Sequence, residues 1–128
     1  MAIKDLAKER SQYAYKCVVE AVKKFDDKQQ QKEYKAYVKK IPMMILNNGL
    51  GATFAFVYSK KKSGNTYQLI DMQTKKWLKV DEDLIKWIID QESPEYRATT
   101  NEVLALFNWL KRFADGMIEG DSDGNYKS

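Results

Sequence analysis

Lysines gather in the middle of the chain, where they could neutralise a polyanion. Between residues 35 and 79 nine lysines stand against a single acidic residue, Asp71, so this segment has a net charge of +8. The rest of the chain holds 13 basic and 17 acidic residues, which sum to −4. A basic stretch between near-neutral or acidic flanks is typical of a surface that binds nucleic-acid phosphate. The same lysines could instead only solvate the outer faces of helices, and composition alone favours neither alternative.

Phosphate contact needs positive charge at roughly the phosphate spacing and no particular base. The candidate nucleic-acid-binding residues are therefore the following cations: Lys35, Lys39, Lys40, Lys60, Lys61, Lys62, Arg97, Lys111 and Arg112. Arg97 could equally form a structural ion pair or contact a protein partner. The pair Lys111-Arg112 could instead interact with the C-terminal dipole of its helix.

Aromatic residues could stack on single-stranded bases, but most fit the core better. The three tryptophans, Trp77, Trp87 and Trp109, each fall on the apolar side of a predicted helix. We expect them to pack in the core. The positions of Tyr13, Tyr58 and Tyr67 indicate neither role clearly.

Side chains for catalysis and metal binding are scarce. The chain has no histidine, which removes the commonest general base and metal ligand. Its one cysteine, Cys17, lies on an apolar stripe and is expected to be a core thiol. The acidic run 81–83 begins a predicted helix, where it complements the macrodipole, and Gly49-x-Gly51 lacks the rest of a nucleotide-binding motif. We therefore expect no enzymatic activity, no cofactor and no metal.

Length and composition bound the class of protein. With 128 residues, 44% of them hydrophobic and 31% charged, the chain is expected to form one soluble domain with an ordinary core. It contains no apolar run of about 18 residues, which predicts no membrane span, and its charged N-terminus is unlike a signal peptide. We expect a cytoplasmic protein.

Apolar residues recur at helical spacing through most of the chain, and no stretch alternates with a period of two. The pattern predicts an all-α fold, a single compact bundle of about six helices over residues 3–25, 29–46, 50–61, 67–78, 84–88 and 94–117. Asp81 and Ser93 are the expected N-caps of the last two helices. The folded domain is expected to cover 1–118, and residues 119–128 are expected to form a disordered tail.

The segment 34–56 is expected to contain a tight joint between two helices. Asn47, Asn48 and Gly49 tolerate the left-handed conformation that closes helix C-termini, and Gly51 would let the backbone lie close to a neighbour. Pro42 is expected to kink its helix or to start a new turn. The joint could bring the lysines of 35–40 and 60–62 onto one face.

Two blocks of the sequence resemble the small-subunit family of the type III-B (Cmr) CRISPR RNA-silencing complexes. The first block comprises Tyr34, Val38, Lys39-Lys40-Ile41-Pro42, Ile45, Asn48-Gly49-Leu50-Gly51 and Thr53-Phe54-Ala55-Phe56. The second comprises Tyr96-Arg97, Glu102 and the run from Leu104 to Ala114. Both occur in the family's order and together cover about a third of the chain, which makes the resemblance specific.

The resemblance implies an all-α, non-catalytic subunit of an antiviral effector. Small subunits of this family stack in several copies beside the backbone subunits and help to form the channel for guide RNA and target RNA, while cleavage belongs to the backbone subunit. A basic face along the stack would neutralise target phosphate without reading sequence, because the guide does that. The implied partners are the other effector subunits, neighbouring small-subunit copies, guide RNA and target RNA.

Two other functions stay open on the residues alone. The chain could be a stand-alone helical module that binds RNA or single strands. It could also be a structural adaptor whose basic face meets an acidic protein.

Overall fold

The computed structural model describes residues 3–120, which fold into six α-helices joined by short segments. The helices are α1 (Ile3–Lys24), α2 (Lys28–Asn48), α3 (Leu50–Lys60), α4 (Thr66–Leu78), α5 (Leu84–Ile89) and α6 (Ser93–Met117). No strand occurs among these residues, so the predicted all-α fold of six helices is confirmed. None of the described helices is both long and apolar enough to cross a lipid bilayer. All but the first two residues of the predicted tail lie outside the described range.

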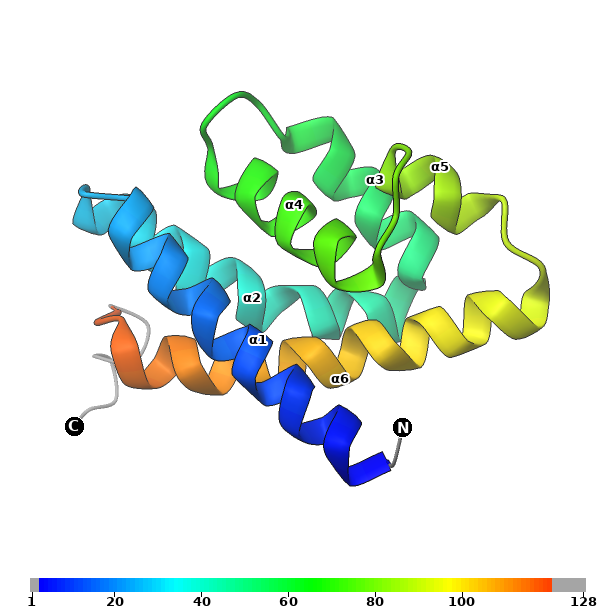
Figure 1. Ribbon diagram of the computed structural model, residues 1–128. Helices are drawn as coiled ribbons and strands as arrows, with labels where there is room; N and C mark the ends of the chain where they lie inside the picture. The colour runs from blue at the N-terminus through cyan, green and yellow to red at the C-terminus, as the bar shows by residue number, and fades with distance from the viewer. Residues whose placement is uncertain (1–2, 121–128) are drawn as a thin grey trace.

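The long helices α2 and α6 run side by side in opposite directions, and α1 crosses them (Figure 1). The shorter helices α3, α4 and α5 pack on one side of this group, with α3 in contact with α2, α4 and α5. Each helix buries its apolar stripe in one shared core, because burying such a stripe is the main source of helical stability in a protein. Tyr34, Phe54 and Phe107 are the largest fully buried side chains.

Cys17 lies in this core at 2% exposure. Burial raises the pKa of its thiol to about 12, so the predicted core thiol is confirmed. The tryptophans also fit their predicted role, since Trp77, Trp87 and Trp109 are partly buried and pack against the core.

Gly49 forms the predicted joint between α2 and α3. Its φ is 95°, a region that side chains with a Cβ rarely adopt. The Gly49 N–H donates to the Ile45 carbonyl at 2.8 Å and so ends α2, while its own carbonyl accepts the Thr53 N–H at 3.1 Å and so begins α3. The Gly51 N–H donates to the Tyr96 hydroxyl on α6 at 2.8 Å. A Cβ on Gly51 would lie only 3.3 Å from that oxygen. The absence of a side chain at Gly51 therefore allows its backbone to lie this close to Tyr96.

Pro42 neither ends α2 nor starts a new helix, contrary to one of the two expectations. The helix continues from Lys28 to Asn48 with Pro42 inside it. Proline removes one backbone hydrogen bond, but Val38, Ile41 and Ile45 on the flanking turns are buried in the core. This burial holds the helix together across the proline.

The two predicted N-caps near α5 and α6 are wrong by one or two residues. Asp83 rather than Asp81 precedes α5, and its side chain makes no capping hydrogen bond. Val80 is buried, so the chain is anchored there and the exposed residues after it lead into the helix. Ser93 is already the first residue of α6, and the Glu92 carbonyl accepts the Tyr96 N–H at 2.9 Å.

A polar cluster around Glu102 ties three helices together. The guanidinium of Arg10 on α1 donates to both carboxylate oxygens of Glu102 on α6, at 2.7 and 2.8 Å. The indole N–H of Trp77 on α4 donates to the same carboxylate at 2.7 Å. A paired Arg–carboxylate fork of this kind is among the strongest polar contacts in proteins.

A second buried polar group joins α4 to α1 and α2. The residue that does so is Gln73, which is only 4% exposed. Its Oε1 accepts the Tyr34 hydroxyl at 2.7 Å, and its Nε2 donates to the Cys17 carbonyl at 3.0 Å. Because every buried polar group needs a partner, Gln73 sets the position of α4 relative to the other two helices.

Candidate nucleic-acid interface

One lysine from each of the two lysine stretches lies near the same aromatic ring on α3. The Lys40 ammonium lies 5.6 Å from the centroid of the Phe56 ring, and the Lys60 ammonium lies 5.7 Å from it. Lys40 is also 5.3 Å from the centroid of the Tyr37 ring. The two helices joined at Gly49 therefore bring Lys40 and Lys60 together, which is part of the expected arrangement of the two stretches.

Helical spacing explains why these rings and cations meet. Tyr37 and Lys40 are three residues apart on α2, and Phe56 and Lys60 are four residues apart on α3, so each pair shares a helix face. A cation near a ring is attracted by the negative charge on the ring face. This spacing was present in the sequence, yet Phe56 and Tyr37 were not among the predicted site residues.

Lys61 and Lys62 extend this region at the end of α3. The Lys61 ammonium is 3.0 Å from a carboxylate oxygen of Asp71 on α4, whose side chain is only 7% exposed. Lys61 thus fastens α3 to α4, and its charge is largely balanced. Lys62 is exposed in the following loop. We call Lys40, Lys60, Lys61 and Lys62 the lysine cluster.

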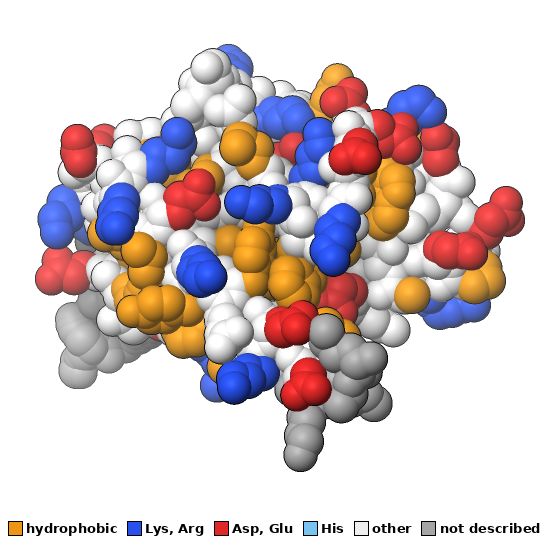
Figure 2. Space-filling model, viewed as in Figure 1, with side chains coloured by type: hydrophobic (Ala, Val, Ile, Leu, Met, Phe, Trp, Pro, Cys, Tyr) orange, Lys and Arg blue, Asp and Glu red, His pale blue; other side chains and the backbone are white. Residues whose placement is uncertain are grey.

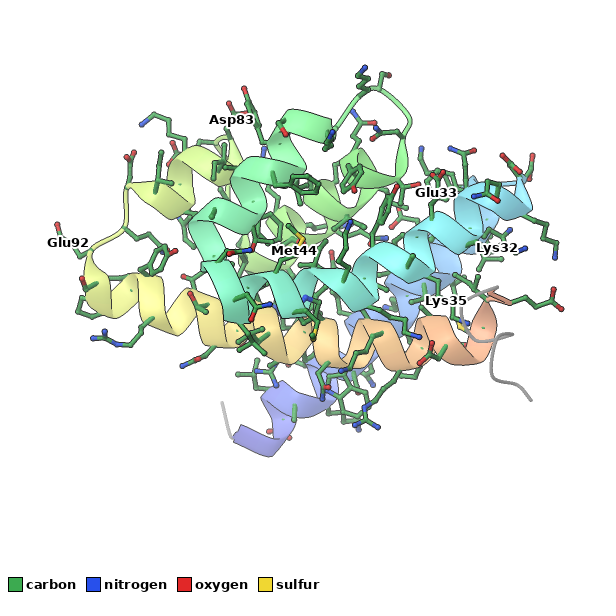
Figure 3. All side chains as sticks on the ribbon, turned by 180° about the vertical axis from the view of Figure 1, so that it is seen from behind. Lys32, Glu33, Lys35, Met44, Asp83 and Glu92 are labelled. Carbon is green, nitrogen blue, oxygen red and sulfur yellow. The ribbon has the colours of Figure 1, made fainter. Side chains whose placement is uncertain are left out.

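Lys35 and Lys39 lie apart from the lysine cluster, because both turn toward the C-terminal end of α6. The Lys35 side chain is 4% exposed, and its ammonium donates to the Ile118 carbonyl at 3.0 Å. Figure 3 shows Lys35 pointing toward that end of α6. Lys39 is 3.0 Å from a carboxylate oxygen of Asp115. Contrary to the expectation of an exposed basic side chain, Lys35 is buried, and its placement suits an anchor between helices.

Replacing Lys35 by alanine is expected to lower the melting temperature by several degrees. The change removes a buried side chain and leaves the Ile118 carbonyl without this donor, a loss of about 1–2 kcal/mol. Lys62→Ala, at an exposed loop position, serves as the matched control and should leave the melting temperature unchanged. Equal effects of the two substitutions in thermal unfolding followed by circular dichroism would contradict the anchoring role of Lys35.

The three remaining candidate cations lie along α6. Arg97 and Arg112 are exposed and Lys111 is half-buried. Arg97 is separated from Lys111 and Arg112 by 14–15 residues, which is about 21–23 Å of helix. A short stretch of RNA therefore cannot contact both ends of α6 at once. The last turn of α6 contains no basic residue, so the alternative of an interaction between Lys111-Arg112 and the helix dipole finds no support.

The face formed by α1 and α4 has a mixed charge. Figure 2 shows Lys and Arg side chains spread over the whole width of this face, with Asp and Glu between them and hydrophobic side chains exposed in several places. Mixed charges of this kind attract a polyanion less than a surface of one sign does. Within residues 3–120, no three His, Cys, Asp or Glu side chains are placed to hold a metal ion.

Three aromatic side chains underlie the lysine cluster. The rings of Tyr37 and Tyr67 are stacked with centroids 4.3 Å apart, and Phe56 meets Tyr67 edge-on at 5.8 Å. Burial, together with the neighbouring Tyr37, raises the pKa of Tyr67 to about 12, so its hydroxyl stays neutral at physiological pH. This group gives the cluster an apolar base.

Comparison with known proteins identifies the family. The family model described as "CRISPR-associated protein (Cas_Cmr5)" matches residues 6–117. A protein of Thermus thermophilus named "CRISPR system Cmr subunit Cmr5" is 31% identical over 109 residues, which cover 85% of this chain and 92% of the relative. The chain belongs to the Cmr5 family of CRISPR-associated proteins.

A solved structure agrees with this assignment. The crystal structure of a CRISPR-associated Cmr5 family protein from Thermus thermophilus matches with a TM-score of 0.75 and 29% sequence identity. The match covers 88% of this chain and 97% of the other. The resemblance drawn from the two sequence blocks is confirmed.

Proposed function

We propose that the chain is the small, non-catalytic subunit of a Cmr-type CRISPR effector complex in the cytoplasm, and that its lysine cluster contacts the phosphates of target RNA. Family membership supports the first part, because the relative with 31% identity is named as a subunit of a Cmr system. The observation that carries the second part is the convergence of Lys40 and Lys60 on Phe56, with Lys62 in the adjoining loop.

The charge of the cluster suits contact with a phosphate backbone rather than reading of bases. Lysine ammonium groups on flexible stems meet phosphate as point charges. Lys40, Lys60 and Lys62 are exposed, whereas Lys61 is balanced by Asp71. One copy would thus supply about three phosphate contacts, a weak interaction alone. Several copies along one strand would raise the overall affinity through multivalency.

Charge reversal at Lys40, Lys60 and Lys62 together is expected to weaken binding of target RNA by the assembled complex. We expect a loss of roughly tenfold or more, and a salt slope flatter by about two units, since each contact with a single strand contributes about 0.7. Lys61 is left unchanged, because a glutamate there would meet the buried Asp71 carboxylate. Filter binding over a series of salt concentrations measures both quantities.

The matched control reverses three exposed lysines of α1, Lys8, Lys16 and Lys23. It changes the net charge by the same amount at a different surface, so it should leave the salt slope nearly as in the wild type. Copurification with a tagged backbone subunit tests the first part of the proposal and shows whether both variants still assemble. If both variants assemble and have the same salt slope, the lysine cluster does not contact RNA.

A further inference from the structure

A cavity of about 360 Å³ lies beside the lysine cluster, between α2, the end of α3 and the start of α4. Three kinds of side chain line it: the rings of Tyr37 and Tyr67, the exposed lysines Lys60 and Lys62, and the carboxylate of Glu33. Its volume falls within the range of small-molecule sites in proteins, which begins at about 300 Å³.

Glu33 is the side chain that makes this cavity more than a phosphate site. It extends from α2 toward the segment that links α3 to α4 (Figure 3). Within the described residues, the Glu33 carboxylate accepts one hydrogen bond, from the hydroxyl of buried Thr66. This bond is long, at 3.5 Å. A carboxylate repels a bare anion but accepts hydrogen bonds from the N–H groups of a base.

Lys60 and Lys62 both line the cavity, and neither forms an ion pair with an acidic side chain in the described part of the chain. Among the residues that the structure describes, Lys61 is the member of the lysine cluster that forms an ion pair, with Asp71. The side chain of Asn65, in contrast, is already engaged at both ends, because it donates to the Lys60 carbonyl at 3.0 Å and accepts the Gln68 N–H at 2.8 Å. It therefore fixes the loop that carries Lys62.

We propose that this cavity binds one unpaired nucleotide of an RNA strand, with the base against the stacked pair Tyr37–Tyr67 and Glu33, and the phosphate at Lys60 and Lys62. A nucleotide carries the three complementary chemistries, since it has a flat apolar base, hydrogen-bond donors and an anion. Stacking on aromatic side chains tolerates any base, so the site discriminates a nucleotide from a bare phosphate rather than one base from another. The inference rests on the proposed RNA contact and assigns it a specific pocket.

Titration of the isotope-labelled full chain with small probes, followed by NMR, tests the pocket. Adenosine 5′-monophosphate should shift the resonances of Glu33, Thr66 and Tyr67 and bind about tenfold or more tightly than ribose 5-phosphate, because only the former has a base to stack. A pentamer of adenylate RNA should displace the monophosphate. Equal binding of the two probes, no shifts at the pocket, or failure of the pentamer to displace the monophosphate would each overturn the proposal.

Substitutions then assign the preference to particular side chains. Tyr67→Leu and Glu33→Gln should each reduce the ratio of the two affinities, whereas Lys60→Gln should weaken both probes alike and keep the ratio. Tyr58→Leu, at a tyrosine of α3 that is 48% exposed and does not line the cavity, is the control and should change neither affinity. If Tyr67→Leu does not fold, Glu33→Gln and the wild-type comparison still decide.

The pocket and the proposed function fail separately. If the charge-reversal variant has the same salt slope as the wild type, while the wild-type chain binds the monophosphate in the pocket, the backbone contact is overturned and the pocket is kept. Absence of monophosphate binding, with the charge-reversal effect intact, would overturn the pocket and keep the backbone contact.

Discussion

Glu102→Ala is expected to lower the free energy of unfolding by about 2–3 kcal/mol and the melting temperature by roughly 10 °C. The substitution removes the carboxylate that accepts two bonds from Arg10 and one from the Trp77 indole. The Arg10 and Glu102 side chains are only 14% and 25% exposed, so water replaces these bonds only in part. Chemical denaturation of the purified chain measures the loss.

The matched control is an exposed ion pair. Lys86 and Asp90 lie 2.7 Å apart on α5 and at its end, with side chains 64% and 57% exposed. Lys86→Ala should leave the melting temperature unchanged, because exposed pairs contribute little. If Glu102→Ala were as mild as Lys86→Ala, the cluster of Arg10, Trp77 and Glu102 would not hold α1, α4 and α6 together.

The same cluster predicts a dependence on pH. Burial pushes the pKa of Glu102 upward, but the bonds from Arg10 and Trp77 outweigh it and the pKa is lowered from its ordinary 4.5. The unfolded chain therefore takes up this proton at a higher pH than the folded chain. The stabilisation is complete above about pH 5 and is lost as the pH falls through the folded pKa. The stability difference between wild type and Glu102→Gln should shrink over that range.

Gly49→Val is expected to cost about 1–3 kcal/mol of stability, because Gly49 has a φ of 95° and a ψ of 160°. This combination is almost confined to glycine. The Gly49 peptide also bonds to Ile45 in α2 and to Thr53 in α3, so any relief of the strain would disturb the end of one helix and the start of the next. Thermal unfolding of the variant measures the effect.

Gly116→Ala is the control for the glycine experiment. Gly116 lies inside α6, and apart from its chain neighbours and the backbone of its own helix no atom lies within 4 Å of the place where a Cβ would stand. Alanine favours helix over glycine by up to about 1 kcal/mol, so this variant should be as stable as the wild type or slightly more so. An unchanged melting temperature in Gly49→Val would contradict the view that the positive φ is required there.

Local patterns of residue types predicted much of the fold. The helical spacing of apolar residues predicted six helices close to their observed bounds, since each helix must turn one stripe to the core. The joint at Gly49 was predictable because only glycine adopts its backbone conformation without strain. Of the two alternatives for Pro42, the start of a new turn is wrong: Pro42 lies inside α2, and the burial of Val38, Ile41 and Ile45 explains why the helix continues.

The candidate site was predictable in part. Segment charge pointed to lysines of both stretches, and the joint brings Lys40 and Lys60 to the same ring. The sequence did not distinguish Lys35 from Lys40, although one is buried against Ile118 and the other is exposed. The exposure of each lysine depends on which helix packs beside it, and the spacing of apolar residues within α2 does not predict that neighbour.

The sequence by itself thus determined the class of fold, the helix joint, the excess of positive charge and the family. The tertiary structure decided which charges remain available. Asp115 and Ile118 reach Lys35 and Lys39 from more than 70 residues away along the chain, and Glu33 comes beside Lys60 and Lys62 only because α4 starts next to α2. Contacts between helices distant in the chain depend on how their buried faces pack together, and no local pattern of residue types specifies that packing.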